Sequence, residues 1–284
     1  MGIHKHYLQI HLAVLLFGGA GLFGKLIQMS SGGIVLGRAF WGAFFILLIK
    51  NSFNVSFKPK TTKDLLVFCL LGVILAFHWV AFFESIQLSS VAIGVLTFST
   101  FPIFTSLLEP FVDKEKIKLN NLILSAITFV GVALVLPSFD IQDEYTQGAL
   151  WGVASGASFA VLALISKHMI KNYSANTVSF YQNSVASMIL MPFFIVDVIV
   201  GSYQDWLYLI VLGVIFTGIA HTLFIHSMKG MKAQTASLIT CLEPLYAILL
   251  AWILLNEVPT FRMFIGGLII LTVTIYVTMN SEAN

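Results

Sequence analysis

The chain has 284 residues, of which 58% are hydrophobic and 10% are charged, and its mean hydropathy is +0.94. A water-soluble domain has about 25% charged residues, and a soluble fold of this length could not cover its surface with so few. The composition therefore excludes a cytosolic enzyme, a nucleic-acid-binding protein and a disordered protein. It predicts that the chain lies in a lipid bilayer.

Ten segments of the sequence are apolar enough to cross a bilayer, which takes about 20 mostly apolar residues in a helix. We predict spans at residues 8–27, 33–49, 65–86, 90–111, 119–136, 148–169, 176–199, 205–226, 233–255 and 261–279. Runs such as residues 66–77 are apolar on all sides, whereas the strands of a transmembrane barrel alternate apolar and polar residues. The predicted fold class is therefore an all-α membrane protein with ten transmembrane helices.

The basic residues gather on one side of the predicted membrane. If the amino terminus is cytoplasmic, the outer side receives only Lys25, Arg38 and Arg262. The inner side receives Lys5, Lys50, Lys58, Lys60, Lys63, Lys114, Lys116, Lys118, Lys167, Lys171, Lys229 and Lys232. Because basic residues favour the cytoplasmic side, we expect a multi-pass protein of the inner (plasma) membrane with both termini in the cytoplasm.

The two halves of the sequence repeat one another at a spacing of 142 residues. The matched pairs are Lys25 and Lys167, Phe82 and Phe224, Ser85 and Ser227, Pro102 and Pro244, and Glu115 and Glu257. We predict one five-helix repeat in residues 1–142 and a second in residues 143–284. Since five crossings are an odd number, the second repeat is inverted relative to the first. Inverted repeats are typical of secondary transporters, which bind their substrate near mid-membrane between the halves.

Several short motifs follow one another along the whole chain. They are Gly24-Lys25, Arg38, Pro102 with Glu115, Glu243-Pro244 with Asn256-Glu257, and Gly266-Gly267. On these residues the chain resembles the drug/metabolite transporter superfamily, specifically its EamA-type ten-helix exporters of the YddG-like kind. It departs from them at Phe17-Gly18, where the family often has Trp-Gly, and at Gln182. The resemblance implies export of solutes, usually amino acids or related metabolites, across the inner membrane.

Ionisable side chains inside a bilayer are costly, so each one needs a reason. Glu243 lies in the ninth predicted span before Pro244, which frees the carbonyl group of Thr240. We expect Glu243 either to contact a substrate ammonium group or carry a proton, or to be held by a neighbouring helix for packing alone. His78 and His221 lie at nearly mirrored positions, and they either line a central cavity or serve as packing groups.

Charged residues near the ends of the predicted spans suggest gates. Lys25, Arg38 and Glu84 are expected near the outer membrane level, either as an outer gate or as a snorkelling lysine with an Arg–Glu pair that ties the spans together. Lys167 and Glu109 are the expected counterpart near the inner face. A last set of repeated residues is expected to be structural: Pro102, Pro244, Glu115 and Glu257.

Neutral polar and aromatic residues complete the predicted binding site. Trp79 and Tyr181 are expected to line an apolar pocket, and Thr97 and Thr100 are expected to offer hydroxyl groups to the substrate. Glycines recur at every fourth position in residues 33–37 and 148–156, which predicts close helix packing within the bundle. A homodimer remains an alternative use of these glycines.

The predicted function is that of a secondary transporter that exports small metabolites, amino acids or related amphipathic solutes, by alternating access. The alternatives are an intramembrane enzyme and a channel-like bundle. The sequence contains no H-E-x-x-H or G-x-S-x-G motif, and a channel usually repeats its filter through oligomer symmetry. Cys69 and Cys241 have no metal-ligand spacing, so no metal or cofactor is expected. The expected partners are a small-molecule substrate and membrane lipid, with no nucleic acid.

Overall fold

The computed structural model describes residues 2–50, 57–113, 119–137, 140–227, 239–240 and 242–280, and these residues form helices and no strand. The helices of the first half are α1 (Gly2–Ala20), α2 (Phe23–Leu26), α3 (Ser31–Leu48), α4 (Thr62–Leu88), α5 (Val91–Phe98), α6 (Phe101–Asp113) and α7 (Leu119–Val135). Those of the second half are α8 (Glu144–Met169), α9 (Ala175–Val200), α10 (Tyr203–Gly213), the π-helix η1 (Val214–Ile219), α11 (Ala220–Ser227), α13 (Glu243–Leu255) and α14 (Phe261–Asn280).

The predicted membrane spans are confirmed as apolar helices. The described residues contain six helices that are long and apolar enough to cross a membrane, and four shorter apolar helices. Each of these ten segments coincides with one of the predicted spans. The ninth span was predicted to begin at residue 233, whereas the described helix α13 begins at Glu243; residues 228–238 and 241 lie outside the described part of the chain.

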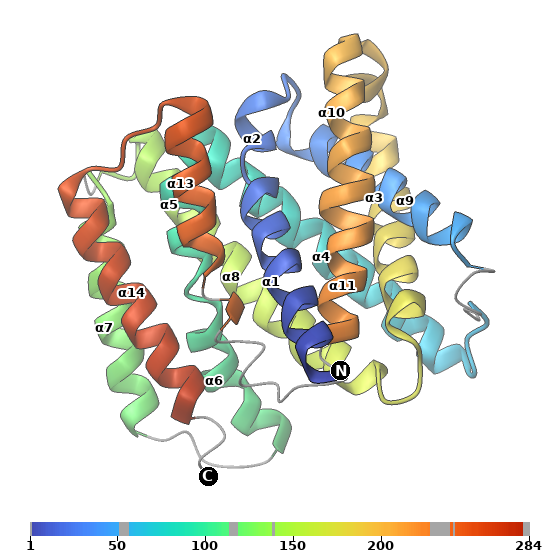
Figure 1. Ribbon diagram of the computed structural model, residues 1–284, viewed down its shortest axis with the longest axis horizontal. Helices are drawn as coiled ribbons and strands as arrows, with labels where there is room; N and C mark the ends of the chain where they lie inside the picture. Colours follow the sequence, from blue (N-terminus) through green and yellow to red (C-terminus); the bar gives the residue numbers. More distant parts are fainter. Residues whose placement is uncertain are drawn as a thin grey trace.

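The chain termini and the contacts at the two ends of the helical bundle show in which direction the helices run. The start of α1 and the end of α14 lie at the same end of the bundle, the lower end in Figure 1, which we call the terminal end. At the opposite, far end, the Lys25 ammonium group donates to the carbonyl of Gln87 in the last turn of α4. The Arg262 guanidinium at the start of α14 donates to the carbonyl of Pro137, just after α7. Helices α7 and α14 are therefore antiparallel.

Each helix of the first half runs opposite to its counterpart in the second half (Figure 1). Helix α1 runs towards the far end, while α8 begins there, where Gly148 meets Ser89. Helix α3 begins at the far end, while α9 ends there, where Asp197 accepts a hydrogen bond from Ser30. The fold is thus built from two oppositely directed sets of helices, as expected for an inverted repeat. The central packing between them joins α4 with α8 and α9, and α3 with α9.

Two helices begin at prolines that occupy equivalent positions in the halves. The fourth predicted span is broken between α5 and α6 at Ser99 and Thr100, and Pro102 lies in the first turn of α6. In the second half, Pro244 lies in the first turn of α13. Proline is well tolerated there because the first turn leaves its backbone N–H groups without an intrahelical acceptor. Both prolines therefore start helices within the apolar spans.

Close helix contacts explain the repeated glycines. A Cβ atom on Gly148 would lie 2.7 Å from the Ser89 side chain, and one on Gly156 would lie 2.8 Å from the carbonyl oxygen of Phe98. Gly152 faces Thr97 and Ser85 in the same way. Along α3, Gly33 approaches Asp197 and Gly37 approaches Leu209. These glycines therefore pack helices of this chain against one another, as their spacing predicts.

Candidate functional site

A buried arginine lies where helices of the two halves meet. The Arg38 side chain on α3 is 3% exposed, and its Nε donates a hydrogen bond of 3.1 Å to the Thr217 hydroxyl on η1. The guanidinium carbon lies 3.9 Å from the centre of the Trp79 ring on α4 and 5.4 Å from that of Phe83. Arg38 is thus held by one hydrogen bond and by cation–π contacts with Trp79 and Phe83. Among the described residues, its two terminal nitrogens have no hydrogen-bond acceptor.

Aromatic rings continue from Trp79 into the second half. The His221 ring on α11 meets Trp79 edge to face at a centroid distance of 5.7 Å, and it lies 5.1 Å from Phe17 on α1. Trp79 and His221 are separated by the same 142 residues that relate the two repeats. Residues related by a twofold axis touch only close to that axis. The contact therefore places this cluster at the junction of the two repeats.

A buried carboxyl group lies across this junction from Arg38. Glu243 is 8% exposed and occupies the first turn of α13, where Gly18 of α1 packs against its backbone. Arg38 and Glu243 attract one another electrostatically. Within the described part of the chain they form no direct ion pair, and no donor bonds the Glu243 carboxylate. The two opposite charges thus approach the junction from different halves without neutralising one another by contact.

We call Phe17, Arg38, Trp79, Thr217, His221 and Glu243 the central cluster. Three of these residues come from each half of the chain. The cluster contains a hydrogen-bonding fork for an anion, a carboxylate for a cation, and aromatic surface beside them. Together these groups suit a small solute with both charges and an apolar part.

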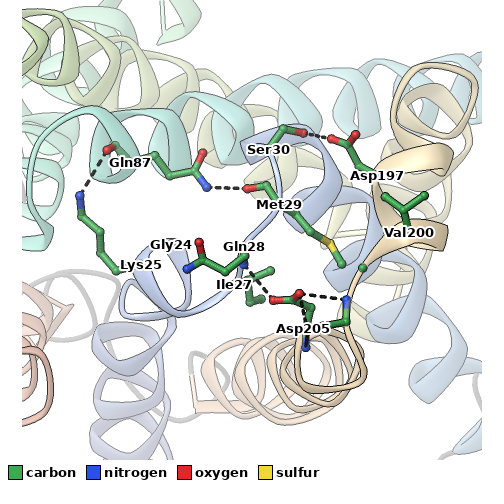
Figure 2. A pocket seen from close by; sticks show the side chains of 12 residues that line it. Gly24, Lys25, Ile27, Gln28, Met29, Ser30, Gln87, Asp197, Val200 and Asp205 are labelled. Atoms are coloured by element: carbon green, nitrogen blue, oxygen red, sulfur yellow. Dashed lines mark hydrogen bonds between the residues drawn. The ribbon is translucent and has the colours of Figure 1, made fainter.

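A second polar region lies at the far end of the bundle. Lys25, Gln87 and Asp205 line a cavity of about 740 Å³. Figure 2 shows their side chains around it. The Lys25 ammonium group donates to the carbonyls of Gln87 and Ser89 at 3.2 and 2.9 Å, so it caps the end of α4. It is also attracted by Glu257 and Glu144.

Further hydrogen bonds tie the loop between α2 and α3 to its neighbours. The Gln87 amide donates to the carbonyl of Met29 at 2.8 Å, and Asp205 accepts from the backbone of Gln28 at 2.8 Å. Ser30 donates to Asp197, and Ser31 donates to Glu84 at 2.6 Å. We call these contacts, together with those of Lys25, the far-end network.

Two of the predicted substrate-binding groups bond to other parts of this chain. The His78 Nδ1 lies 2.8 Å from the Ser155 hydroxyl and 3.0 Å from its carbonyl, which ties α4 to α8. Tyr181 is far from the central cluster: its hydroxyl donates to the carbonyl of Phe57 at 2.6 Å, and its ring stacks on Phe68. The Tyr181 helix α9 begins at the terminal end, which explains this position.

The predicted threonines lie at the broken helix rather than in an open pocket. The Thr97 hydroxyl donates to the carbonyl of Ile93 at 2.7 Å, and the Thr100 hydroxyl donates to that of Thr97 at 2.7 Å. Both hydroxyl groups are thus bonded to backbone carbonyls of α5, and both side chains are buried. Thr240 is buried beside the start of α13. The structure therefore brings Trp79, His221 and Glu243 together, but not the whole predicted set.

The ion pair that was predicted between Arg38 and Glu84, both in the described part of the chain, is not formed. Arg38 bonds Thr217, and Glu84 accepts from Ser31 in the far-end network. Arg38 lies seven residues into α3, about 10 Å along the helix from its start. Its depth separates it from the far end, so it belongs to the central cluster.

The remaining predicted charges are distributed over both ends. Lys167 is exposed in the last turn of α8. The Glu257 carboxylate accepts a hydrogen bond of 2.9 Å from the backbone of Val91, so it caps the start of α5 as a structural residue. The side chain of Glu109 and all of Glu115 lie outside the described part of the chain.

Sequence reasoning did not select Phe17 and Thr217 as site residues. Phe17 was noted only because the resembled family often has Trp at this position; otherwise it is one of 25 phenylalanines, and its residue type does not distinguish it from those that face lipid. Thr217 was noticeable only as a hydroxyl group one turn before His221. The π-helix that contains it has no signature in composition or spacing.

Comparison with known proteins identifies the family of this fold. A solved crystal structure matches 98% of this chain and 99% of its own, with a TM-score of 0.67 and 18% sequence identity, which shows the fold alone. A protein of Archaeoglobus fulgidus named an uncharacterized transporter is 30% identical over 262 residues, which cover 92% of each chain.

Two further relatives carry transporter names. The uncharacterized transporter YxxF of Bacillus subtilis is 27% identical over 86% of this chain and 79% of its own. An S-adenosylmethionine uptake transporter of Rickettsia conorii is 24% identical over 86% of this chain and 83% of its own. The model of the EamA-like transporter family matches the chain twice, over residues 4–136 and 146–279, in agreement with the internal repeat. The chain therefore belongs to the EamA-like transporter family and is a multi-pass membrane protein.

Proposed function

We propose that this protein is a secondary transporter of small zwitterionic metabolites, with amino acids as the principal class. The observation that carries the proposal is the relation between Arg38 and Glu243. They are buried, opposite in charge and contributed by different halves, and no direct ion pair joins them. An α-amino acid matches this arrangement, because its carboxylate suits the guanidinium fork and its ammonium group suits the carboxylate.

The aromatic part of the central cluster supports an apolar side chain on the substrate. Trp79 and Phe17 flank His221 and provide ring surface beside the two charges. Burying such a side chain against rings adds apolar contact without a further polar requirement. We therefore expect aromatic and larger aliphatic amino acids to be preferred over acidic or basic ones.

The construction of the site supports a mechanism of alternating access. Each half supplies three residues of the central cluster, so a relative movement of the halves would change which side of the membrane the cluster faces. The far-end network would hold one side closed, and its contacts would separate when that side opens. We assign the far end to the outside of the inner membrane and both termini to the cytoplasm, because the basic residues favour the terminal side. Export is the proposed direction.

The decisive test is counterflow in proteoliposomes loaded with each of the twenty amino acids in turn. We expect saturable exchange for aromatic or aliphatic amino acids. Arg38→Lys keeps the charge but loses the fork, and Glu243→Gln keeps the shape but loses the charge. Each of these two variants should raise the half-saturation concentration about tenfold or more, because each loses a hydrogen bond to a charged group of the substrate. Arg262→Lys and Asp140→Asn are the exposed controls and should exchange like the wild type.

The proposal is wrong if Arg38→Lys and Glu243→Gln both exchange amino acids with wild-type affinity. Turnover of a lipid by the purified protein would instead support an intramembrane enzyme, and single-channel conductance would support a channel.

S-adenosylmethionine is a second candidate substrate, suggested by the Rickettsia conorii relative. It carries an α-amino acid group, which matches Arg38 and Glu243, and an aromatic base, which matches Trp79. It belongs in the same counterflow panel. Faster exchange of S-adenosylmethionine than of any amino acid would favour this candidate.

A further inference from the structure

The Arg38 guanidinium is fixed by a chain of two hydrogen bonds. Its Nε donates to the Thr217 hydroxyl at 3.1 Å, and that hydroxyl donates its own proton to the carbonyl of Leu212 at 2.9 Å. Thr217 is fully buried, so water does not compete for either bond. A threonine hydroxyl has a single proton to donate. Because the Thr217 hydroxyl donates this proton to the carbonyl of Leu212, its oxygen acts as the acceptor for the N–H group of Arg38 Nε.

The π-helix η1 determines which way Thr217 points. In an α-helix a threonine hydroxyl commonly bonds the carbonyl four residues earlier. Here it bonds the carbonyl five residues earlier, as the wider turn of residues Val214–Ile219 permits. The hydrogen-bonded turn of a π-helix contains one residue more than that of an α-helix, so the side chains within it point in different directions from those of a continuous α-helix. Such π-turns are frequent at functional sites. In η1 the rotation directs Thr217 towards α3.

Two glycines bring the helices close enough for this contact. A Cβ atom on Gly213 would lie 2.9 Å from the carbonyl oxygen of Arg38, and one on Gly42 would lie 3.0 Å from the methyl group of Thr217. The backbones of α3 and the α10–η1 segment are therefore nearly in contact at this level. Thr217 can reach Nε only because neither glycine carries a side chain.

From this geometry we propose that Thr217 is a positioning residue that sets the carboxylate selectivity of the transporter through Arg38. The bond at Nε holds the guanidinium plane against Trp79 and turns the two terminal nitrogens towards the substrate. A planar fork held in this way binds both oxygens of a carboxylate. The inference rests on the proposed function, since it assigns to Arg38 the carboxylate of the substrate.

The first test compares transport of L-phenylalanine and its methyl ester, which lacks the carboxylate charge. In Thr217→Val we expect the half-saturation concentration for the amino acid to rise about tenfold, while that for the ester changes less than about twofold. Thr217→Ser keeps the hydroxyl and should restore wild-type values. Adding Thr217→Val to Arg38→Lys should produce little further change, because the two residues act as one unit.

The second test needs no substrate. Trp79 is made the only tryptophan by replacing Trp41, Trp151, Trp206 and Trp252 with phenylalanine, and its fluorescence is recorded. The emission of Thr217→Val should move towards that of Arg38→Gln, because the guanidinium leaves the ring, whereas the emission of Thr217→Ser should stay in place. Unchanged Trp79 emission in Thr217→Val overturns the inference.

The two tests separate the failure of this inference from that of the proposed function. If Arg38→Lys loses discrimination between acid and ester but Thr217→Val does not, Thr217 has no positioning role. If Thr217→Val raises the half-saturation concentrations for the acid and the ester equally and also lowers the melting temperature, Thr217 has a structural role. That result also overturns the inference. If Arg38→Lys itself leaves the discrimination unchanged, the proposed function fails, while the fluorescence test still decides whether Thr217 holds Arg38.

Discussion

Lys25 provides the most direct test of how the far end is closed. Its ammonium group donates to the carbonyls of Gln87 and Ser89 at the end of α4, at 3.2 and 2.9 Å. Lys25→Met keeps the length of the side chain but removes the charge and both donors. The remaining contacts of the far-end network, including Ser31 with Glu84, stay in place. The mutation therefore weakens the closed arrangement without abolishing it.

The expected magnitude follows from the two bonds. Each hydrogen bond contributes about 0.5–1.5 kcal/mol, and a cation at a helix carboxyl end adds about 0.3–1 kcal/mol. Lys25 is half-buried, so solvent screening reduces this sum. We take about 1.4 kcal/mol as the net loss, which shifts the equilibrium between closed and open far ends about tenfold towards the open state.

Labelling from outside the cell measures this shift. Cys69 and Cys241 are first replaced by serine, and Ala20→Cys places a thiol at the buried end of α1, below the far-end network. We expect Lys25→Met to raise its rate of reaction with a membrane-impermeant maleimide about tenfold. Lys25→Arg retains donors for both carbonyls and should label like the parent, as should Lys63→Met at the terminal end. An unchanged labelling rate in correctly folded Lys25→Met protein would refute the proposed role of Lys25.

Three further outcomes follow from the packing and the helix directions. Gly152→Ala should lower the free energy of unfolding by about 1–3 kcal/mol, because the new methyl group meets Thr97 and Ser85. The control Gly21→Ala makes only ordinary contacts of 3.5 Å or more and should be tolerated, and thermal melting in detergent compares the two variants. Ser155→Ala should lower the free energy of unfolding by about 1–3 kcal/mol, because buried His78 loses its hydroxyl partner, while the half-saturation concentration for amino acids in counterflow stays unchanged. A loss of affinity without a loss of stability would instead indicate that His78 contacts the substrate. Cysteines placed at residues 3 and 283 should both react with an impermeant maleimide only after the membrane is opened, and labelling of just one of them in intact cells would exclude the proposed topology.

The sequence was sufficient to predict the spans and their repetition. Length and hydropathy define a membrane helix almost independently of its neighbours, because every backbone group must be bonded within the helix. The repeat was visible because charged residues and prolines are rare inside such helices. Helix packing through Gly148, Gly152 and Gly156 was predictable for a similar reason, since small residues at this spacing have few other uses.

The partners of the intramembrane charges could not be predicted in the same way. Arg38 was expected near Glu84 because both lie close to the same end of their spans. Which residue a side chain meets depends on the rotation of each helix about its axis, and here a π-turn brings Thr217 to Arg38 instead. His78 and Trp79 are neighbours in sequence, but they face different sides of α4, so one ties α8 and the other joins the central cluster.

The repeat also explains why the central cluster is chemically asymmetric. At the 142-residue spacing, Arg38 corresponds to Phe180 and Glu243 corresponds to Phe101, so each charge occupies a position where the other half has a phenylalanine. A site made of two identical halves would present the same charge twice, which suits neither a zwitterion nor a buried environment. Duplication can therefore supply the opposed helices and the contact of Trp79 with His221, but the recognition of two opposite charges requires that the halves differ. If the proposed function holds, substituting either charge by the phenylalanine of its counterpart should abolish exchange of amino acids while the twofold packing of the bundle is retained.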